Sequence, residues 1–191
     1  MDYLIIIVIS YLLGSIPFGL ILTKLFLKKD IRNIGSGNIG ATNVLRSGNK
    51  LIGYTTLLLD ILKGILPVLY VKFYYPDFIY ISALSVFLGH VFPIWLKFNG
   101  GKGVATYVGI LFSINLIYGL VFGITWIIIF LVSKYSSLSS LLGSISIQVY
   151  LFFVNGDQII FFIIMFVLIF YTHRENIKRL KNKEESKTKI Y

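Results

Sequence analysis

The chain has no cysteine and few acidic residues, and both shortages exclude kinds of chemistry. Its 191 residues include 8 Asp and Glu against 18 Lys and Arg, which gives a formal net charge of +10. Without cysteine, a thiol nucleophile is excluded. The carboxylates form no sequence cluster suited to a divalent cation. We therefore expect neither a metal ion nor any other cofactor.

The N-terminal segment lacks the marks of a cleaved signal peptide. Its first residues carry Asp2 and no Lys or Arg, and no small-x-small cleavage site follows the apolar run. The run itself, residues 3–27, contains one charge and exceeds the ~20 residues that cross a ~30 Å hydrocarbon layer. We interpret it as a retained membrane span.

Long apolar blocks dominate the rest of the chain, which is 57% hydrophobic against about 45–50% in an ordinary soluble domain. Five blocks are visible, at residues 3–27, 51–70, 78–96, 104–132 and 138–171. The last is split by a turn signal at Asn155 to Asp157. In the fourth, Ser113 to Asn115 offers a helix N-cap in the middle of the block.

The positions of Lys and Arg predict the orientation. They surround the glycine-rich stretch 35–46 and fill a basic C-terminal tail at about 174–191, and cytoplasmic loops are enriched in these residues. Both segments lie inside only if the block 104–132 crosses twice. The sequence therefore predicts an all-α polytopic integral membrane protein with seven transmembrane helices. Its N-terminus would be outside and its C-terminus cytoplasmic, in a single membrane-embedded domain over residues 1–191. A re-entrant segment within 104–132 is the alternative.

Two glycine motifs lack the context of a nucleotide loop. The stretch 34–40, "IGSGNIG", fits G-x-G-x-x-G with Asp60 about twenty positions later, but a membrane span precedes it where a dinucleotide-binding fold needs a short strand. The stretch 99–103, "NGGKG", is no Walker loop, because Leu96 replaces its first glycine and Gly103 replaces its Ser or Thr. We expect no nucleic-acid partner either, since no soluble domain exists to shape a groove.

Four segments on the predicted cytoplasmic face combine small residues with hydroxyls, amides or a cation. They are "GSGNIGATNVLR" (35–46), "GHVFPIWLKFNGGKGVAT" (89–106), "SSLSS" (136–140) and "HRENIKRL" (173–180). Glycine lets backbone N–H groups approach an anion closely, and Lys102 follows two glycines just before an expected helix N-terminus. Together the four segments predict phosphate binding on this face.

These motifs, together with "LLDILKGILPV" (58–68), resemble in their order the bacterial acyl-phosphate-dependent glycerol-3-phosphate acyltransferases, the PlsY family, over essentially the whole chain. The resemblance implies transfer of a fatty acyl group from acyl phosphate to the 1-hydroxyl of sn-glycerol 3-phosphate. The products would be 1-acyl-glycerol 3-phosphate (lysophosphatidic acid) and phosphate, in phospholipid biosynthesis at the cytoplasmic face of the bacterial cell (inner) membrane. The implied partners are the two substrates and membrane lipid, with no obligate protein partner.

The sequence departs from the family pattern at three positions. Ile39 stands where proline is usual, Asn99 where lysine is usual, and Lys183 where glycine is usual. The first departure affects the glycine loop, and the second removes one cation near Lys102. The third leaves the role of Glu185 open.

The resemblance also implies roles for individual residues. Lys102 should bind and polarise the acyl phosphate, and His173 and Asn176 should complete the catalytic set. The hydroxyl proton would pass to His173 or to a substrate phosphate oxygen, in which case His173 acts as a hydrogen-bond donor. Substrate binding is implied for a larger set: Ser36, Gly37, Asn38, Thr42, Asn43, Arg46, Gly100, Gly101, Gly103 and Ser139.

Four polar residues, among them Ser139 of the substrate-binding set, have both a structural and a functional interpretation. Asp60 and Lys63 lie three residues apart in an apolar block, where charges are often functional, but an ion pair that joins the loop to the bundle explains them equally well. His90 at a span end fits a packed, hydrogen-bonded residue better than a catalyst. Ser139 would serve as a helix cap as readily as it would bind substrate.

Other function classes are less well supported. The H-x-x-x-x-D dyad of acyl-CoA-dependent glycerolipid acyltransferases is absent, because Trp95 and Lys178 stand five residues after the two histidines. A small membrane transporter for anions or phosphate esters would use a similar basic, glycine-lined face. It is the weaker interpretation, because no motif is repeated and the polar motifs gather on one face. A noncatalytic partner of a larger membrane enzyme is a third alternative.

Overall fold

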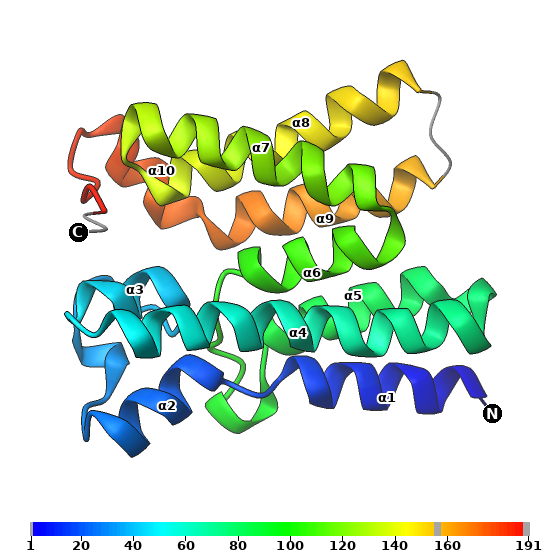
Figure 1. The fold of residues 1–191 in the computed structure, drawn as a ribbon, viewed down its shortest axis with the longest axis horizontal. Helices are drawn as coiled ribbons and strands as arrows, with labels where there is room; N and C mark the ends of the chain where they lie inside the picture. Colours follow the sequence, from blue (N-terminus) through cyan, green and yellow to red (C-terminus); the bar gives the residue numbers. More distant parts are fainter. Residues whose placement is uncertain (1, 155–157, 189–191) are drawn as a thin grey trace. The chain divides into compact units, whose positions relative to one another are not determined.

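The computed structural model describes residues 2–154 and 158–188 and divides into two compact units, Met1–Ile114 and Asn115–Tyr191 (Figure 1). The first unit contains α1 (Asp2–Gly14), α2 (Phe18–Phe26), η1 (Ile31–Asn33), α3 (Ala41–Arg46), α4 (Lys50–Tyr74), η2 (Pro76–Phe78), α5 (Ile79–Val91), η3 (Ile94–Leu96) and α6 (Val104–Ile114), the η elements being single 3-10 turns. The second contains α7 (Leu116–Ser133), α8 (Ser136–Phe153), α9 (Ile159–Thr172) and α10 (Arg174–Lys181). The single domain expected over residues 1–191 stays a prediction.

Small residues let the long helices of the first unit approach one another closely. A Cβ on Gly89 of α5 would come within 3.0 Å of the Tyr11 backbone in α1, and one on Gly64 of α4 would come equally close to the Thr106 backbone in α6. Figure 1 shows α4, the longest helix described in this unit, running alongside α1. Glycine at these contacts allows backbone-to-backbone packing that a side chain would prevent.

The first apolar block is interrupted, which the sequence prediction of the span did not include. The helix breaks just before Pro17, because proline has no N–H and disfavours a helical conformation in the preceding residue. Two distant side chains occupy the break: Lys63 Nζ donates to the Ile16 carbonyl at 2.8 Å, and Trp95 Nε1 donates to Ser15 Oγ at 2.7 Å. The break is therefore part of the packing of the unit.

The fourth apolar block forms two helices, divided at the N-cap signal of Ser113 to Asn115, while its two membrane crossings stay a prediction. α6 ends at Ile114 and α7 begins at Leu116, and the Asn115 side chain caps α7 by accepting a hydrogen bond from the Ile117 backbone at 2.8 Å. With 11 residues, α6 is about 16 Å long, roughly half the thickness of a hydrocarbon core.

The second unit places α7, α8 and α9 side by side (Figure 1). The chain reverses between α7 and α8 at Lys134, which has a left-handed φ of 64°. Buried aromatic and aliphatic side chains, including Phe122, Ile147 and Phe162, form the core between these helices.

Five stretches within the described residues are long and apolar enough to cross a membrane. They are Tyr3–Phe26, Lys50–Tyr74, Pro76–Leu96, Leu116–Ser133 and Ser136–Phe153, and α9 with α10, which meet at a 59° bend, would make a sixth. The count of seven spans and the outward N-terminus stay predictions. The turn expected at Asn155 to Asp157 lies outside the described residues, although α8 ends shortly before it and α9 begins shortly after it.

Candidate functional site

The glycine loop between η1 and α3 is organised by one buried side chain, that of Asn43. Its Oδ1 accepts a hydrogen bond from the Ser36 backbone at 2.9 Å, and its Nδ2 donates to the carbonyls of Ile34 and Asn38 at 2.9 and 2.8 Å. Asn43 is only 2% exposed. Its amide is thus engaged by the loop backbone, although the sequence analysis placed Asn43 among the substrate-binding residues.

The other polar residues expected in this loop are more accessible than Asn43. Ser36 and the neighbouring Gly37 are exposed, and the side chains of Asn38, Thr42 and Arg46 are partly exposed. Gly37 has a left-handed φ of 71°, which glycine adopts without steric cost. The Arg46 side chain runs along the loop, since its Cδ lies 3.9 Å from the place that a Cβ on Gly35 would occupy. The loop therefore offers a hydroxyl and a guanidinium, which are groups that bind phosphate.

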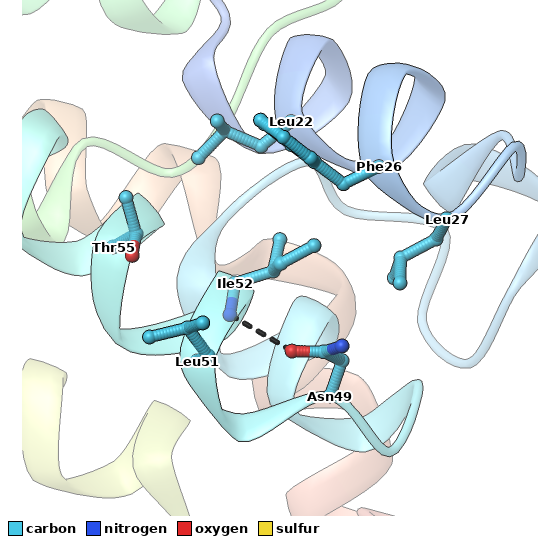
Figure 2. Close-up of a pocket in the computed structure, with 7 residues that line it drawn as sticks. All are labelled: Leu22, Phe26, Leu27, Asn49, Leu51, Ile52 and Thr55. Atoms are coloured by element: carbon cyan, nitrogen blue, oxygen red, sulfur yellow. Dashed lines mark hydrogen bonds between the residues drawn. The ribbon is translucent and has the colours of Figure 1, made fainter.

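An apolar cluster packs beneath the loop. It consists of Leu20, Ile31, Ile39, Val44 and Ile52, and Ile39, which replaces the usual proline, is 5% exposed within it. Beside this cluster is an open pocket of about 370 Å³, lined mainly by apolar side chains of α2 and the start of α4 such as Leu22, Phe26 and Leu51 (Figure 2). Such a lining suits hydrocarbon rather than phosphate.

Lys102 extends from a glycine turn held between α5 and α6. The backbone N–H groups of Gly100 and Gly101 donate to carbonyls at the end of α5 at 3.0 and 3.1 Å. Gly103 follows with a left-handed φ of 82°, and α6 begins at Val104. The expected position of Lys102 just before a helix N-terminus is therefore confirmed, and the helix dipole there favours an anion.

A buried polar cluster adjoins this turn. Asp60 Oδ1 and Lys63 Nζ are 2.8 Å apart, and His90 Nδ1 lies 3.9 Å from the same Asp60 oxygen and 3.0 Å from Thr106 Oγ1. The side chains of Asp60, Lys63 and His90 are no more than 4% exposed. The structure thus brings together Asp60, Lys63 and His90, three of the residues whose role the sequence left open. It adds Thr106, the last residue of the predicted segment 89–106, which the sequence alone did not single out as a site residue.

Glu185 joins α8 to α10 in the second unit. Its Oε1 accepts hydrogen bonds from Ser137 Oγ at 2.8 Å and Asn176 Nδ2 at 2.7 Å, and its Oε2 accepts one from Arg179 Nε at 2.8 Å. Burial by itself would raise the pKa of this carboxyl, but the three hydrogen bonds together outweigh burial and lower the pKa below its ordinary 4.5. Glu185, whose role the sequence left open, is therefore a structural anchor for Asn176.

The turn before Glu185 keeps the shape that a glycine would give it. Lys183 has a left-handed φ of 61°, a conformation that costs a residue with a Cβ roughly 1–2 kcal/mol. Glycine, which the family resemblance makes usual here, adopts it freely. Lys183 therefore adopts a backbone conformation that glycine would take at lower cost.

His173 lies between α9 and α10 and is 2% exposed. Its Nδ1 is 2.8 Å from the Ile169 carbonyl, which can only accept, so Nδ1 carries the hydrogen and a neutral ring has its lone pair on Nε2. Asn176, 3% exposed, follows three residues later in α10. Ser139, in the first turn of α8, donates to the carbonyl of the N-cap residue Tyr135 at 2.9 Å, so its hydroxyl bonds the helix backbone but does not form the cap that the sequence allowed.

One basic residue near the loop is already paired. Arg32 donates to Asp30 through Nε at 2.9 Å and Nη2 at 2.6 Å, and Lys24 Nζ lies 3.6 Å from the same carboxylate. The hydrogen bond from the Arg32 side chain lowers the pKa of Asp30 well below its ordinary value. We therefore do not count Arg32 among the site cations.

Comparisons with known proteins agree with this arrangement of motifs. The model of the family described as glycerol-3-phosphate acyltransferase matches residues 4–183. The chain is 75% identical to a glycerol-3-phosphate acyltransferase of Pelagibacter ubique (strain HTCC1062), with 100% of both chains covered. It is 47% identical to one of Mesorhizobium japonicum (strain LMG 29417 / CECT 9101 / MAFF 303099), with 94% of this chain and 93% of the relative covered.

Two crystal structures of PlsY, an integral membrane glycerol 3-phosphate acyltransferase, are similar to the structure. The glycerol 3-phosphate form has a TM-score of 0.93 at 38% identity and covers 98% of this chain and 96% of its own. The lysophosphatidic acid form has a TM-score of 0.89 at 37% identity and covers 98% and 95%.

Proposed function

We propose that this chain, which belongs to the glycerol-3-phosphate acyltransferase family, transfers a fatty acyl group from acyl phosphate to the 1-hydroxyl of sn-glycerol 3-phosphate. The products are 1-acyl-glycerol 3-phosphate and inorganic phosphate. The two PlsY structures are of a glycerol 3-phosphate form and a lysophosphatidic acid form, which correspond to the acceptor and the product of this transfer. Family membership favours an acyltransferase over the transporter that the sequence left open.

The observation that carries the proposal is the turn that holds Lys102. An acyl phosphate is an activated ester whose leaving group is a phosphate anion, so the transfer requires stabilisation of negative charge more than a strong nucleophile. Lys102 supplies a cation, and the N-terminus of α6 supplies the positive end of a helix dipole. We assign Lys102 to the phosphate or the carbonyl oxygen of the donor.

The glycine loop of the same unit is assigned to phosphate binding. Ser36 offers a hydroxyl and Arg46 a guanidinium, whose planar fork matches two phosphate oxygens. Asn43 is assigned to shaping this loop and not to contact with substrate, because its amide already bonds the loop backbone.

In the reaction, the glycerol oxygen forms a bond to the acyl carbon, and the bond between that carbon and the bridging phosphate oxygen breaks. The hydroxyl proton needs an acceptor. We assign this role to His173, whose Nδ1 bond to a carbonyl means that a neutral ring carries its lone pair on Nε2. A phosphate oxygen of the substrate is the competing acceptor. Replacing His173 by Gln keeps a hydrogen-bonding side chain but removes the base. Turnover would therefore be lost if His173 accepts the proton and would persist if a phosphate oxygen accepts it.

The proposed location is the bacterial inner membrane, with the site on the cytoplasmic side. This assignment depends on the concentration of Lys and Arg in the loops that hold the motifs. We further propose acyl phosphate as the donor in preference to acyl-CoA or acyl-carrier protein, because in the part of the chain that the structure describes no segment between the apolar helices is large enough to form a docking domain for either carrier.

The test is incubation of the purified chain with palmitoyl phosphate and glycerol 3-phosphate, followed by measurement of lysophosphatidic acid and released phosphate. Parallel reactions contain palmitoyl-CoA or palmitoyl-acyl-carrier protein as donor, or excess EDTA. We expect product from palmitoyl phosphate, little from the other donors and no loss in EDTA. Equal turnover with palmitoyl-CoA would overturn the donor assignment, and no product from any donor would overturn the proposed reaction.

A charge-removal pair tests the site itself. Removing one partner of a shielded charge pair costs about 2–5 kcal/mol, so Lys102→Ala should lower kcat/KM roughly 30-fold to several thousandfold. The matched control is Lys187→Ala, since Lys187 is exposed in the basic tail. It should change kcat/KM by only a few-fold, about the ~1 kcal/mol that a basic residue near a lipid surface contributes. Equal losses in the two variants would remove Lys102 from the site.

A further inference from the structure

His90 is buried in the first unit and contacts the Lys102 turn in two ways. Its main-chain carbonyl accepts the Gly101 N–H at 3.1 Å. Its ring also lies against Gly101: a Cβ built on that glycine would come within 3.0 Å of His90 Nε2, a separation that real Cβ atoms essentially never show. The residue that precedes Lys102 therefore rests on the His90 imidazole.

The orientation of this ring is set from α6 and α4. Thr106 Oγ1 lies 3.0 Å from His90 Nδ1, and Thr106 belongs to the first turn of α6, just after Lys102 and Gly103. From α4, Asp60 Oδ1 lies 3.9 Å from the same nitrogen, and Lys63 pairs with Asp60 at 2.8 Å. The backbone of α6 is itself fixed at this point, because Gly64 of α4 lets the two helices approach at Thr106.

We propose that His90 is a positioning residue for Lys102, and that the Thr106 hydroxyl holds the His90 ring in the orientation that supports Gly101. Gly101 and Thr106 lie on either side of Lys102 in the sequence, and both contact the His90 imidazole. The direction of the Lys102 side chain then depends on the buried His90 ring. This inference rests on the proposed function, since it assumes that Lys102 acts on a phosphate-bearing substrate.

The test compares three hydroxyl changes in α6. Thr106→Val is nearly isosteric and removes the contact to His90, whereas Thr106→Ser keeps an oxygen able to reach Nδ1. Ser113→Ala is the matched control in the same helix, because the Ser113 hydroxyl donates to the Gly109 carbonyl within α6. Each change is made in the parent chain and in a Lys102→Ala background.

Two readouts are taken on folded, detergent-solubilised protein. The first is kcat and KM for palmitoyl phosphate, and the second is the Kd of hexadecyl phosphate, a nonreactive phosphate-bearing chain that remains measurable where turnover is too slow. The melting temperature of every variant reports its stability separately. A purely structural role would lower the melting temperature and act equally in both backgrounds, since independent sites are additive.

Loss of one buried hydrogen bond corresponds to about a tenfold change, so we expect Thr106→Val to weaken hexadecyl phosphate binding and to lower kcat/KM by about that factor in the parent. In the Lys102→Ala background the same change should have less than about a twofold effect, because residues that act as a unit are not additive. Thr106→Ser should recover most of the loss, and Ser113→Ala should cause little.

Equal factors in the two backgrounds, or unchanged binding in Thr106→Val, would overturn the positioning role. Failure of the proposed function looks different. A parent chain that binds hexadecyl phosphate but forms no lysophosphatidic acid from palmitoyl phosphate would remove the acyl transfer and leave the coupling between Thr106 and Lys102 measurable.

Discussion

The contact between Gly101 and the His90 ring makes Gly101→Ala a sharp perturbation. Gly101 is buried and does not have a left-handed φ, so alanine is compatible with its backbone conformation and the effect is purely steric. The new methyl group would lie closer than 3.0 Å to His90 Nε2, whereas an ordinary contact begins at about 3.4 Å. The glycine turn or the buried ring must therefore move by several tenths of an ångström at least.

Overpacking of this kind costs about 1–3 kcal/mol. The ring cannot move easily, because Thr106 contacts its Nδ1, and so the turn that carries Lys102 takes part of the displacement. If the strain raises the free energy of the transition state by this amount, kcat/KM falls by roughly 5- to 150-fold. A displaced catalytic group has losses of a similar size, since a misplacement of about 1 Å can cost ~100-fold.

The matched control is Gly123→Ala in α7, where a Cβ would meet no other atom within 4 Å. Alanine in a helix interior is favoured over glycine by roughly 0.5–1 kcal/mol, so this variant should melt at a slightly higher temperature and keep its activity. The assay is release of phosphate from palmitoyl phosphate with glycerol 3-phosphate, at matched amounts of folded protein. Parent-like kcat/KM in Gly101→Ala would refute the reasoning, because the turn would then be free to yield without moving Lys102.

Three further predictions test other parts of the structure. Glu185 has a folded-state pKa below its ordinary 4.5, so its contribution to stability is complete above that pH and is lost as pH falls through the lowered pKa. The melting temperature of the parent should therefore drop more steeply below about pH 4.5 than that of Glu185→Gln, and parallel curves would contradict the role of this carboxylate. Asn43→Ala leaves loop backbone groups unpaired at a cost of about 1–3 kcal/mol, so it should lower both the melting temperature and kcat/KM. Asn99→Ala, at an exposed site, is the control and should change neither quantity. Equal effects of the two substitutions would count against Asn43 as the organiser of the loop. Single cysteines at Gly48 and Ser136, in a parent without cysteine, should both be labelled from the cytoplasm, and labelling of Ser136 from outside would mean that the block 104–132 crosses once.

Several features of the fold could be predicted because they depend on short stretches of the chain. Apolar runs long enough to cross a bilayer identified the membrane helices. Asn115 marked the division of the fourth block, because its side chain caps α7 by accepting a hydrogen bond from the Ile117 backbone, two residues later. Lys102 was placed before a helix N-terminus because the glycines beside it cannot continue a helix without cost.

Other features depend on partners that are distant in the sequence. Glu185 bonds Ser137, 48 residues before it, and His90 contacts Thr106 in another helix. The break before Pro17 was hidden within an apolar run, and Lys63, which occupies it, lies 47 residues from the carbonyl that it binds. No local pattern distinguishes these polar residues from others of the same type.

The sequence by itself thus determined the membrane class and the family motifs, and it predicted the phosphate-binding residues, because hydropathy, capping and glycine conformation act over a few neighbouring residues. The tertiary structure alone decided which polar groups are anchors: Asn43 within its loop, Glu185 beside Asn176, and Thr106 against His90. The physical reason is that a buried polar group must find a partner. Helix packing determines that partner by bringing together backbone and side-chain atoms from segments far apart in the chain.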